Sequence, residues 1–406
     1  MNQKTSVTLD QERPFEFDEL FFSRTDERGV IQAGNSVFQS ISAYSWDEIL
    51  HAPHRLIRHP DMPRGVFWLM WDTIQKGNPI GAYVKNLAKD GCYYWVFAVV
   101  TPIEGGFLSV RLKPSSTVFE AVKKQYADLR DAEVTQNVSP KESAARLTDH
   151  LAALGYDSYS AFMAQALSLE VSARDEHLGR TKDASQTCFE RLAKSAEDLL
   201  YCTSNIADVF SKNKHIPLNL KIHAAQLGDI GTPIGTISDN YTMISNEIQQ
   251  QMSEFVRNCH NVSQAVGKGW FLTSTAMVQR QVIDFFQYEE TCEAVNQDVE
   301  MQHLRAQQQS YSEQALKGLR AISSQIELFS QSCAEMRRLS TSLKVIRVIG
   351  KIESASIDNS LNNLDHLIDD LGQFQSVLGE GLDAVDVANK HMRSDVDILI
   401  GRRAAA

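Results

Sequence analysis

The sequence predicts an α+β domain followed by an all-α region of long helices. Residues 1–116 of the 406-residue chain contain seven of the ten prolines and four of the five tryptophans. The remaining residues contain only three prolines. A proline-poor stretch of that length favours long helices, because proline removes a backbone donor and clashes inside a helix. We therefore expect the change between the two kinds of structure near residue 116.

Short segments in the first part predict a five-stranded antiparallel sheet with helices. The expected strands are residues 20–24, 30–33, 80–87, 92–102 and 107–112, with tight glycine turns between neighbours. The expected helices are residues 35–42, 45–50 and 62–76. Ser45 and Glu48 have the spacing of a capping box. This order describes an α+β domain over residues 15–114 that can enclose a small ligand between helices and sheet.

Several short runs follow one another in this domain. They are Ala33-Gly34-Asn35-Ser36-Val37-Phe38, Tyr44-Ser45-Trp46-Asp47-Glu48-Ile49, Ile57-Arg58-His59-Pro60-Asp61-Met62-Pro63, Val84-Lys85-Asn86, and Gly91 with Tyr94-Trp95-Val96. In this order they resemble a PAS domain, and more narrowly the flavin-binding PAS domain of bacterial aerotaxis receptors. The run from Arg58 to Pro63 is highly characteristic of that subfamily.

The resemblance implies a cofactor and its site. In that subfamily the PAS domain holds FAD noncovalently, and the redox state of the isoalloxazine reports respiratory electron flow. The pocket roles transfer to Arg58, His59, Asp61, Trp71 and Asn86, with Asn35, Phe67 and Lys85 as further matched positions. The residue types suit a flavin, which needs an apolar slot and a few donors and acceptors. The apolar slot would be formed by Phe67, Trp68, Met70 and Trp71. The Asn86 amide would supply a donor and an acceptor, and Arg58 would offset the negative charge of a phosphate or of the reduced flavin.

Other interpretations of the same residues stay open. Haem occurs in PAS domains, and His51, His54 or His59 would be its axial ligand. The same histidines have a metal-like spacing, but nearby cysteines and carboxylate clusters are missing, so we predict no metal site. The run from Arg58 to Asp61 can also simply organise the helix start, with Asp61 as its N-cap. The aromatic side chains of the expected helix over residues 62–76 can also belong to the hydrophobic core and need no ligand.

Heptad-like spacing dominates the second part of the chain. Apolar residues alternate steps of three and four at Phe189–Phe210, Tyr241–Val262, Leu319–Met336 and Leu361–Leu378. We predict a helical linker over residues 115–180 and a helical bundle or coiled coil over residues 181–400. The seams can be buried against one another or against a second copy, and a homodimer is the expected assembly.

A faint repeat predicts two related helix-turn-helix units in the bundle. Residues 220–222, Gly228 and residues 237–240 recur about 120 residues later as residues 343–345, Gly350 and residues 357–360. Chance similarity among amphipathic helices is the alternative. Both units resemble a degraded form of the hairpin tip of methyl-accepting chemotaxis proteins. The resemblance implies a signalling partner, such as a chemotaxis kinase or coupling protein.

Composition excludes several classes of function. The formal net charge is −11, which makes a general nucleic-acid binder unfavourable because phosphates would be repelled. Six scattered cysteines and an amino terminus without a leader predict a reduced, cytoplasmic protein. No stretch has the length and apolarity of a membrane span, and no nucleotide, protease or nucleophile motif predicts an enzyme.

The sequence thus predicts a soluble signal-transduction sensor of the aerotaxis type, which senses redox state or oxygen through FAD and relays it through the helices. Two alternatives remain. One is an adaptor or dimerisation protein whose PAS domain is empty, and the other is a haem-based gas sensor.

Overall fold

The computed structural model describes residues 8–156, 158–226, 228–290, 293–356 and 362–405. Its contacts divide the chain into two compact units. The sheet unit comprises the residues up to Gln186 together with Gly267–Lys317, and the bundle unit comprises Thr187–Val266 with the residues from Gly318 onward. Residues 267–317, which the sequence analysis assigned to the bundle, thus belong to the sheet unit.

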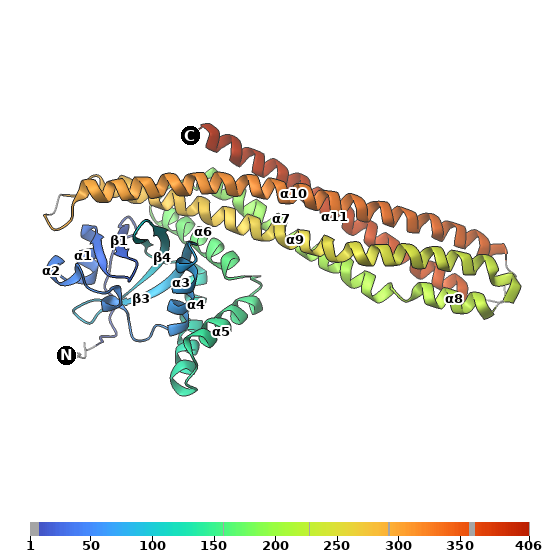
Figure 1. Cartoon of the computed structure of the whole chain (residues 1–406), viewed down its shortest axis with the longest axis horizontal. Helices are drawn as coiled ribbons and strands as arrows, with labels where there is room; N and C mark the ends of the chain where they lie inside the picture. Colours follow the sequence, from blue (N-terminus) through green and yellow to red (C-terminus); the bar gives the residue numbers. More distant parts are fainter. Residues whose placement is uncertain (1–7, 157, 227, 291–292, 357–361, 406) are drawn as a thin grey trace. The chain divides into compact units, whose positions relative to one another are not determined.

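A five-stranded antiparallel sheet forms the centre of the sheet unit, which confirms the predicted fold class (Figure 1). Its strands are β1 (Phe21–Asp26), β2 (Ile31–Gly34), β3 (Ile80–Leu87), β4 (Tyr93–Ile103) and β5 (Gly106–Leu112). The strand order is β2-β1-β5-β4-β3, so β5 is central and pairs with both β1 and β4. The turns at Gly29, Gly91 and Gly105 all have positive φ, which glycine adopts without steric cost.

Short helices between β2 and β3 lie on one face of the sheet. They are α1 (Ser36–Ser42), α2 (Trp46–Ile49), the 3-10 helix η1 (His54–Ile57) and α3 (Arg64–Gln75). The predicted capping box is present at α2, where the backbone N–H of Ser45 donates to Glu48 over 3.0 Å. Asp61 is not the N-cap of α3; that position is Pro63.

The N-terminus of α3 is capped from another helix. Glu133, on α4, accepts hydrogen bonds from the backbone N–H groups of Arg64 and Gly65, each over 2.9 Å. A carboxylate there satisfies two donors that a helix start leaves unpaired and also complements the helix dipole. Proline has no side chain that could do this, which explains why the cap comes from a distant part of the sequence.

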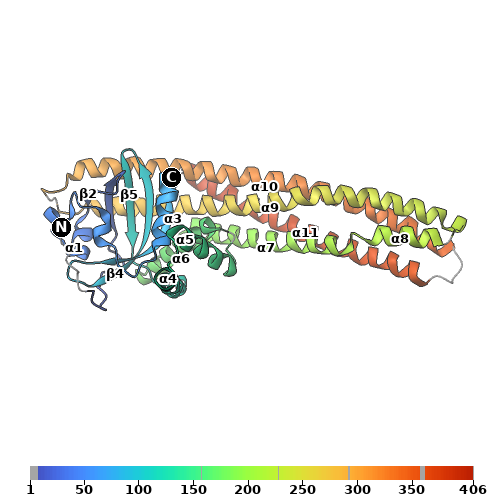
Figure 2. The same cartoon turned by 60° about the horizontal axis from the view of Figure 1, so that its bottom comes forward.

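Helices cover the opposite face of the sheet. Helices α4 (Thr117–Thr135), α5 (Pro140–Ala153) and α6 (Tyr159–His177) follow the last strand (Figure 2). On this face the Phe22 ring meets Phe286 edge-on, with centroids 5.0 Å apart. Arg24 donates to both carboxylate oxygens of Glu300, over 2.8 and 2.7 Å. These contacts explain why residues 267–317 group with the sheet.

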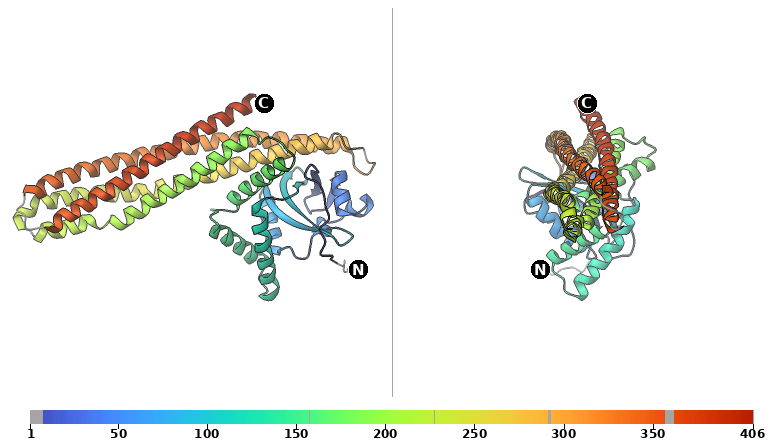
Figure 3. Two further views of the ribbon diagram at one scale, coloured as in Figure 1. Left: turned by 180° about the vertical axis from the view of Figure 1, so that it is seen from behind. Right: turned by 90° about the vertical axis from the view of Figure 1, so that its right-hand side faces the viewer.

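The bundle unit is made of α7 (Ala184–Asn213), α8 (Ile216–Gln226), the 3-10 helix η2 (Gly228–Gly231) and long parts of α9 (Thr232–Phe286), α10 (Gln297–Ser356) and α11 (Asn362–Ala405). The long helices run side by side (Figure 3). None of the helices that the structure describes is long and apolar enough to cross a membrane.

The predicted heptad seams are buried within one chain. The seam residues from Phe189 to Phe210, Tyr241 to Val262 and Leu319 to Met336 are at most 9% exposed. The Phe255 and Phe329 rings stack across α9 and α10 at 5.1 Å. In the fourth seam Ile368, Leu371, Phe374 and Leu378 are buried, whereas Leu361 and the side chain of Leu364 lie outside the described residues. These seams therefore do not require a second copy.

The two repeat units differ in local structure. Gly228 has φ of +60° and lies in the turn between α8 and α9. Gly350, its counterpart in the repeat, lies inside α10, where a Cβ would come within 3.7 Å of Ile237. Residues 357–360 of the second unit lie outside the described residues. The glycines thus occupy a turn in one unit and a helix in the other.

Candidate functional site

A cavity of about 420 Å³ lies between α3 and the sheet. Its size is in the range of small-molecule sites, which is about 300–1,000 Å³. The α3 side chains that line it are Phe67, Met70, Trp71 and Ile74. The strand residues that line it are Ser23, Thr25, Val84, Asn86, Ala98, Val100, Phe107, Ser109 and Arg111. All of these strand residues share one face, as the pairing of Ser23 with Ser109 and of Ala98 with Arg111 requires.

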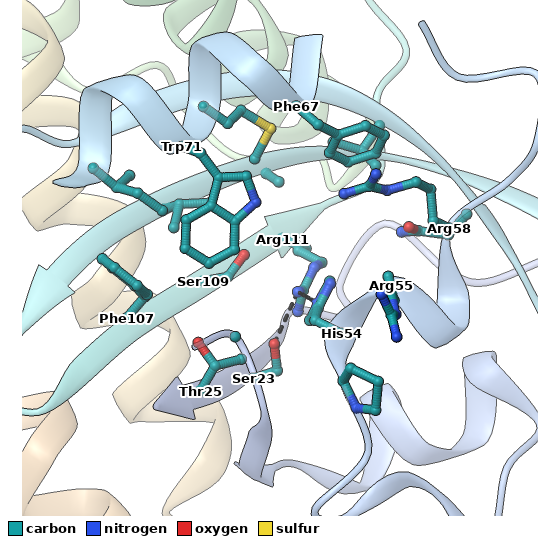
Figure 4. A pocket seen from close by; sticks show the side chains of 18 of the residues that line it. Ser23, Thr25, His54, Arg55, Arg58, Phe67, Trp71, Phe107, Ser109 and Arg111 are labelled. Atoms are coloured by element: carbon teal, nitrogen blue, oxygen red, sulfur yellow. Dashed lines mark hydrogen bonds between the residues drawn. The ribbon is translucent and has the colours of Figure 1, made fainter. Parts of the chain in front are cut away.

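Four of the eight predicted cofactor residues line this cavity: Arg58, Phe67, Trp71 and Asn86. The guanidinium carbon of Arg58 lies 3.5 Å from the centre of the Phe67 ring, a cation-π contact (Figure 4). Trp71 meets Phe107 edge-on, with centroids 5.5 Å apart. Trp68, which the sequence analysis added to the apolar slot, does not line the cavity.

Asn86 is the most informative of these four residues. It is 2% exposed, and its amide nitrogen has no hydrogen-bond partner among the described residues. A buried amide without a partner is costly, since the group loses water and gains nothing in exchange. Asn86 is therefore a group that a bound molecule can satisfy.

Three other predicted residues form a cluster that does not line the cavity: His59, Asp61 and Lys85. Lys85 donates to Asp61 over 2.8 Å, and the Nδ1 atom of His59 accepts from the backbone N–H of Asp61 over 3.1 Å. Burial and the charge of Lys85 lower the pKa of His59, which Asp61 opposes. This cluster joins the turn before α3 to β3, and therefore supports the cavity wall rather than facing the cavity.

Asn35, the eighth predicted residue, is also not part of the cavity lining. It is the N-cap of α1, is 1% exposed, and its Oδ1 accepts from the backbone N–H of Phe22 over 3.2 Å. Its amide donates to Glu289 over 2.7 Å, and Glu289 also accepts from the backbone N–H of Ser36 over 2.9 Å. Asn35 thus connects the first helix of the domain to residues 267–317.

The sequence analysis did not single out Arg111, which is the central charged group of the cavity. Its side chain is 2% exposed and donates to the Ser23 hydroxyl over 2.8 Å (Figure 4). The same nitrogen, Nη2 of Arg111, also donates to Nε2 of His54, over 2.6 Å. Arginine is only a donor, so Nε2 must be the acceptor and His54 is neutral. The signal for Arg111 was a charged residue inside the predicted strand of residues 107–112, whose other residues are uncharged.

The pKa shifts of the cavity residues agree with a neutral His54 and a protonated Arg111. Burial, together with the positive charges of Arg111 and Arg58, lowers the pKa of His54 to about 3. Burial also lowers the pKa of Arg111 to about 10, so the guanidinium remains protonated at neutral pH. Of the three histidines proposed as haem ligands, His54 lines the cavity and His51 and His59 do not. Among the described residues no group of three or more metal-ligating side chains occurs.

Comparison with known proteins assigns this part of the chain to a fold. Residues 33–110 match the family described as the PAS fold. A segment of 133 residues is 35% identical to the aerotaxis receptor of Escherichia coli, and covers 32% of this chain and 26% of that protein. A segment of 206 residues is 24% identical to the bacterioopsin transcriptional activator of Halobacterium salinarum, and covers 48% of this chain and 29% of that protein.

A third relative and two solved structures complete the comparison. The nitrogen fixation regulatory protein of Klebsiella pneumoniae is 32% identical over 81 residues, which are 20% of this chain and 16% of that protein. The dark structure of the blue-light photoreceptor Aureochrome1 LOV is 24% identical, with a TM-score of 0.23, and covers 26% of this chain and 85% of that one. A fungal LOV domain photoreceptor is 18% identical with a TM-score of 0.21, over 27% and 81% of the two chains. The chain thus spans less than a third of each curated relative.

Proposed function

Because residues 33–110 form a PAS domain, we propose that this chain is a redox sensor that holds FAD in the cavity between α3 and the sheet. The observation that carries the proposal is the buried amide of Asn86, whose nitrogen has no partner among the described residues and which faces a cavity with aromatic and apolar side chains on its α3 wall. A flavin offers ring faces for the aromatic side chains and acceptors for such an amide.

The residues of the cavity fit this cofactor. Phe67 and Trp71 on α3 offer apolar ring surfaces, and the opposite wall, formed by the sheet, offers the Phe107 ring and the Asn86 amide as donor and acceptor. Arg58, which stacks on Phe67, offers positive charge for a phosphate. FAD supplies a two-state redox centre whose charge and protonation differ between the states. His59, Asp61, Lys85 and Asn35 act one layer further out in this proposal, by fixing the positions of the cavity walls.

We further propose that the signal passes through the sheet to residues 267–317. Along β1, Ser23 and Thr25 line the cavity while Phe22 and Arg24, which point to the other face, contact the helices. A shift of β1 on the cavity face therefore changes the ion pair between Arg24 and Glu300. Since the Glu300 side chain is 4% exposed, this pair cannot adjust without repacking. Asn35 and Glu289 provide a second connection to the same helices.

Absorbance of the purified full-length protein tests the cofactor, and Asn86→Leu tests its site. We expect a yellow protein with a flavin spectrum, or a colourless one that becomes yellow on adding FAD. Asn86→Leu keeps the volume and removes the hydrogen bonds, so FAD affinity should fall by about tenfold to a hundredfold in a fluorescence titration. Asn78→Leu, at an exposed asparagine before the same strand, is the matched control. A protein that takes up no FAD would contradict the sensor and leave the adaptor interpretation.

The relay predicts a change in hydrogen exchange far from the cavity. In the wild-type protein, FAD binding should slow amide exchange in residues 297–317. Glu300→Gln removes the charge that pairs with Arg24 and is expected to abolish this difference while FAD affinity stays within threefold. Glu313→Gln, at an exposed glutamate on the same helix, should retain it. Equal protection in all three proteins would exclude the ion pair as the connection, without affecting the cofactor assignment.

The output partner would contact the end of the bundle in this proposal. Exposed apolar side chains occur on α8, near the start of α9 and in the C-terminal part of α10. They are Leu218, Ile222, Met243, Val345, Val348, Ile349 and Ile352, each at least 45% exposed. Exposed apolar side chains of this kind are available to bind a partner. The resemblance of this region to the chemotaxis hairpin tip supports a signalling protein as the partner.

A further inference from the structure

The charge of Arg111 is not compensated inside the protein. The side chain is 2% exposed, and no carboxylate among the described residues pairs with it. Its Nη1 atom has no hydrogen-bond partner there. The rings of Phe21 and Phe38 lie 5.6 and 5.3 Å from the guanidinium carbon, where they attract the positive charge. This attraction is weaker than the cost of removing a guanidinium from water, so the rings offset only part of that cost.

Two further donors without partners line the same cavity. Ser109 is two residues before Arg111 on β5, so both side chains lie on one face of the central strand. The hydroxyl of Ser109 and the amide nitrogen of Asn86 are buried and have no partner among the described residues. With Nη1 of Arg111, the cavity therefore holds three buried groups that can donate a hydrogen bond. Arg111 and Ser109 are two residues apart on β5, whereas the register places Asn86 opposite Tyr94, further along the sheet. The two β5 donors are therefore the pair that suits the oxygen atoms of one ligand group.

The ionised residues of the cavity are all positive. Arg28, Arg55, Arg58 and Arg111 are part of the lining, and no aspartate or glutamate is. Arg28 has a partner in Asp26, at 3.4 Å, which lies outside the lining. His54 cannot offset the charge of Arg111, since it is the neutral acceptor of its hydrogen bond. The missing negative charge must therefore come from the occupant of the cavity.

We propose that the inner part of the cavity is an anion subsite, built by Arg111 and Ser109, and that the native ligand presents a carboxylate or phosphate group there. A neutral ligand could satisfy the serine, but only an anion neutralises the arginine. The proposal rests on the proposed function only in that the cavity is a ligand site. The subsite does not require that the ligand is a flavin. If FAD is the ligand, the subsite predicts that the contact between a phosphate and Arg111 contributes most to the affinity.

Paired flavins test the subsite in the full-length protein. Riboflavin and FMN differ by one phosphate, so the ratio of their dissociation constants measures what the anion contributes. We expect the wild-type protein to bind FMN at least tenfold more tightly than riboflavin. Arg111→Met should reduce this preference to less than threefold, and Arg111→Lys, which keeps the charge, should retain part of it. Arg55→Met tests the exposed arginine of the same lining as a competing anion site and should lose less of the preference than Arg111→Met. Arg305→Met, at an exposed arginine outside the lining, is the control and should leave the preference intact.

A second measurement is independent of flavin. Inorganic phosphate and acetate, each compared with chloride at equal ionic strength, should raise the thermal unfolding midpoint of the wild-type protein but not of Arg111→Met. The larger of the two shifts identifies the phosphate or the carboxylate as the better occupant. If no flavin binds while an anion still stabilises only proteins with Arg111, the FAD assignment fails and the subsite stands. Loss of the FMN preference in Arg55→Met instead of Arg111→Met would overturn the subsite. So would a wild-type protein that shows neither an FMN preference nor an anion-dependent shift.

Discussion

Replacing Glu170 with Ala is expected to lower the free energy of unfolding of the sheet unit by about 4 kcal/mol. Glu170, on α6, is completely buried and accepts from the Tyr83 hydroxyl over 2.7 Å. It also accepts from the Ser116 hydroxyl, and from the backbone N–H groups of Ser115 and Ser116 over 2.6 and 3.1 Å. Alanine leaves these buried donors without a partner at the point where the chain leaves the sheet and α4 begins.

Glu170→Gln is the matched control for this prediction. Its amide oxygen can accept from the two backbone N–H groups, while its amide nitrogen donates to the two hydroxyls, which can rotate to accept. The loss should therefore be about 1 kcal/mol. All five tryptophans belong to the sheet unit, so their fluorescence during urea unfolding follows this unit alone. Equal midpoints for the Ala and Gln variants would show that the hydrogen-bond network has little weight.

Acidification is expected to destabilise the sheet unit through His54. Its pKa is lowered from 6.5 to about 3 in the folded protein. Between these two pH values the unfolded chain binds a proton that the folded protein does not, so stability falls as pH decreases below about 6.5. From pH 6.5 to 4.5 this costs about 2 kcal/mol. The ionised groups of the cavity lining are the arginines, including Arg111 and Arg58, so no acidic side chain there offsets the added charge.

Variants separate this contribution from that of the carboxylates. His54→Gln keeps an acceptor for Arg111 but does not titrate, so the loss of stability between pH 6.5 and 4.5 should shrink by about 2 kcal/mol. His150→Gln removes an exposed histidine on α5 and is the control. Unfolding in urea at several pH values measures both. A profile of His54→Gln that coincides with that of the wild type would contradict a neutral His54 in the folded protein.

The elements of the sheet could be predicted because their signals are local. The expected strand at residues 80–87 coincides with β3, since turns at Gly77 and Gly91 bound it on either side. The start of α3 could not be predicted in the same way. The sequence pointed to Asp61 as a cap, but the cap is Glu133, which lies in a different helix. No local pattern indicates a partner that tertiary packing brings in.

The site was predictable only in part, for a related reason. Of the eight motif positions predicted to bind a cofactor, Arg58, Phe67, Trp71 and Asn86 line one cavity, and their role as cofactor ligands stays a prediction. The same motif also contains residues that hold the walls, such as Asp61 and Lys85, and sequence alone does not distinguish these from lining residues. Arg111 belongs to none of the runs. It becomes visible only when the pairing of the strands shows that it shares a face with Ser23 and Ser109.

The bundle shows where a periodic pattern is sufficient and where it is not. Heptad spacing identified the buried residues of α7, α9 and α10, since each seam must be covered by some partner. It did not identify the partner. Both candidates, another helix of the chain and a second copy, present the same apolar surface, and the structure finds the seams covered within one chain.

The sheet unit is built from two stretches of sequence that residues 187–266 separate. Synthesis on the ribosome therefore releases the whole sheet long before the helical residues that cover Phe22 and pair with Arg24. During that interval the part of this face around Phe22 and Arg24 is unprotected, and exposed apolar surface of this kind is a typical starting point for aggregation. A fragment that ends at residue 114, or even at Gln186, would keep that surface permanently. The smallest piece that completes this fold must extend to Lys317.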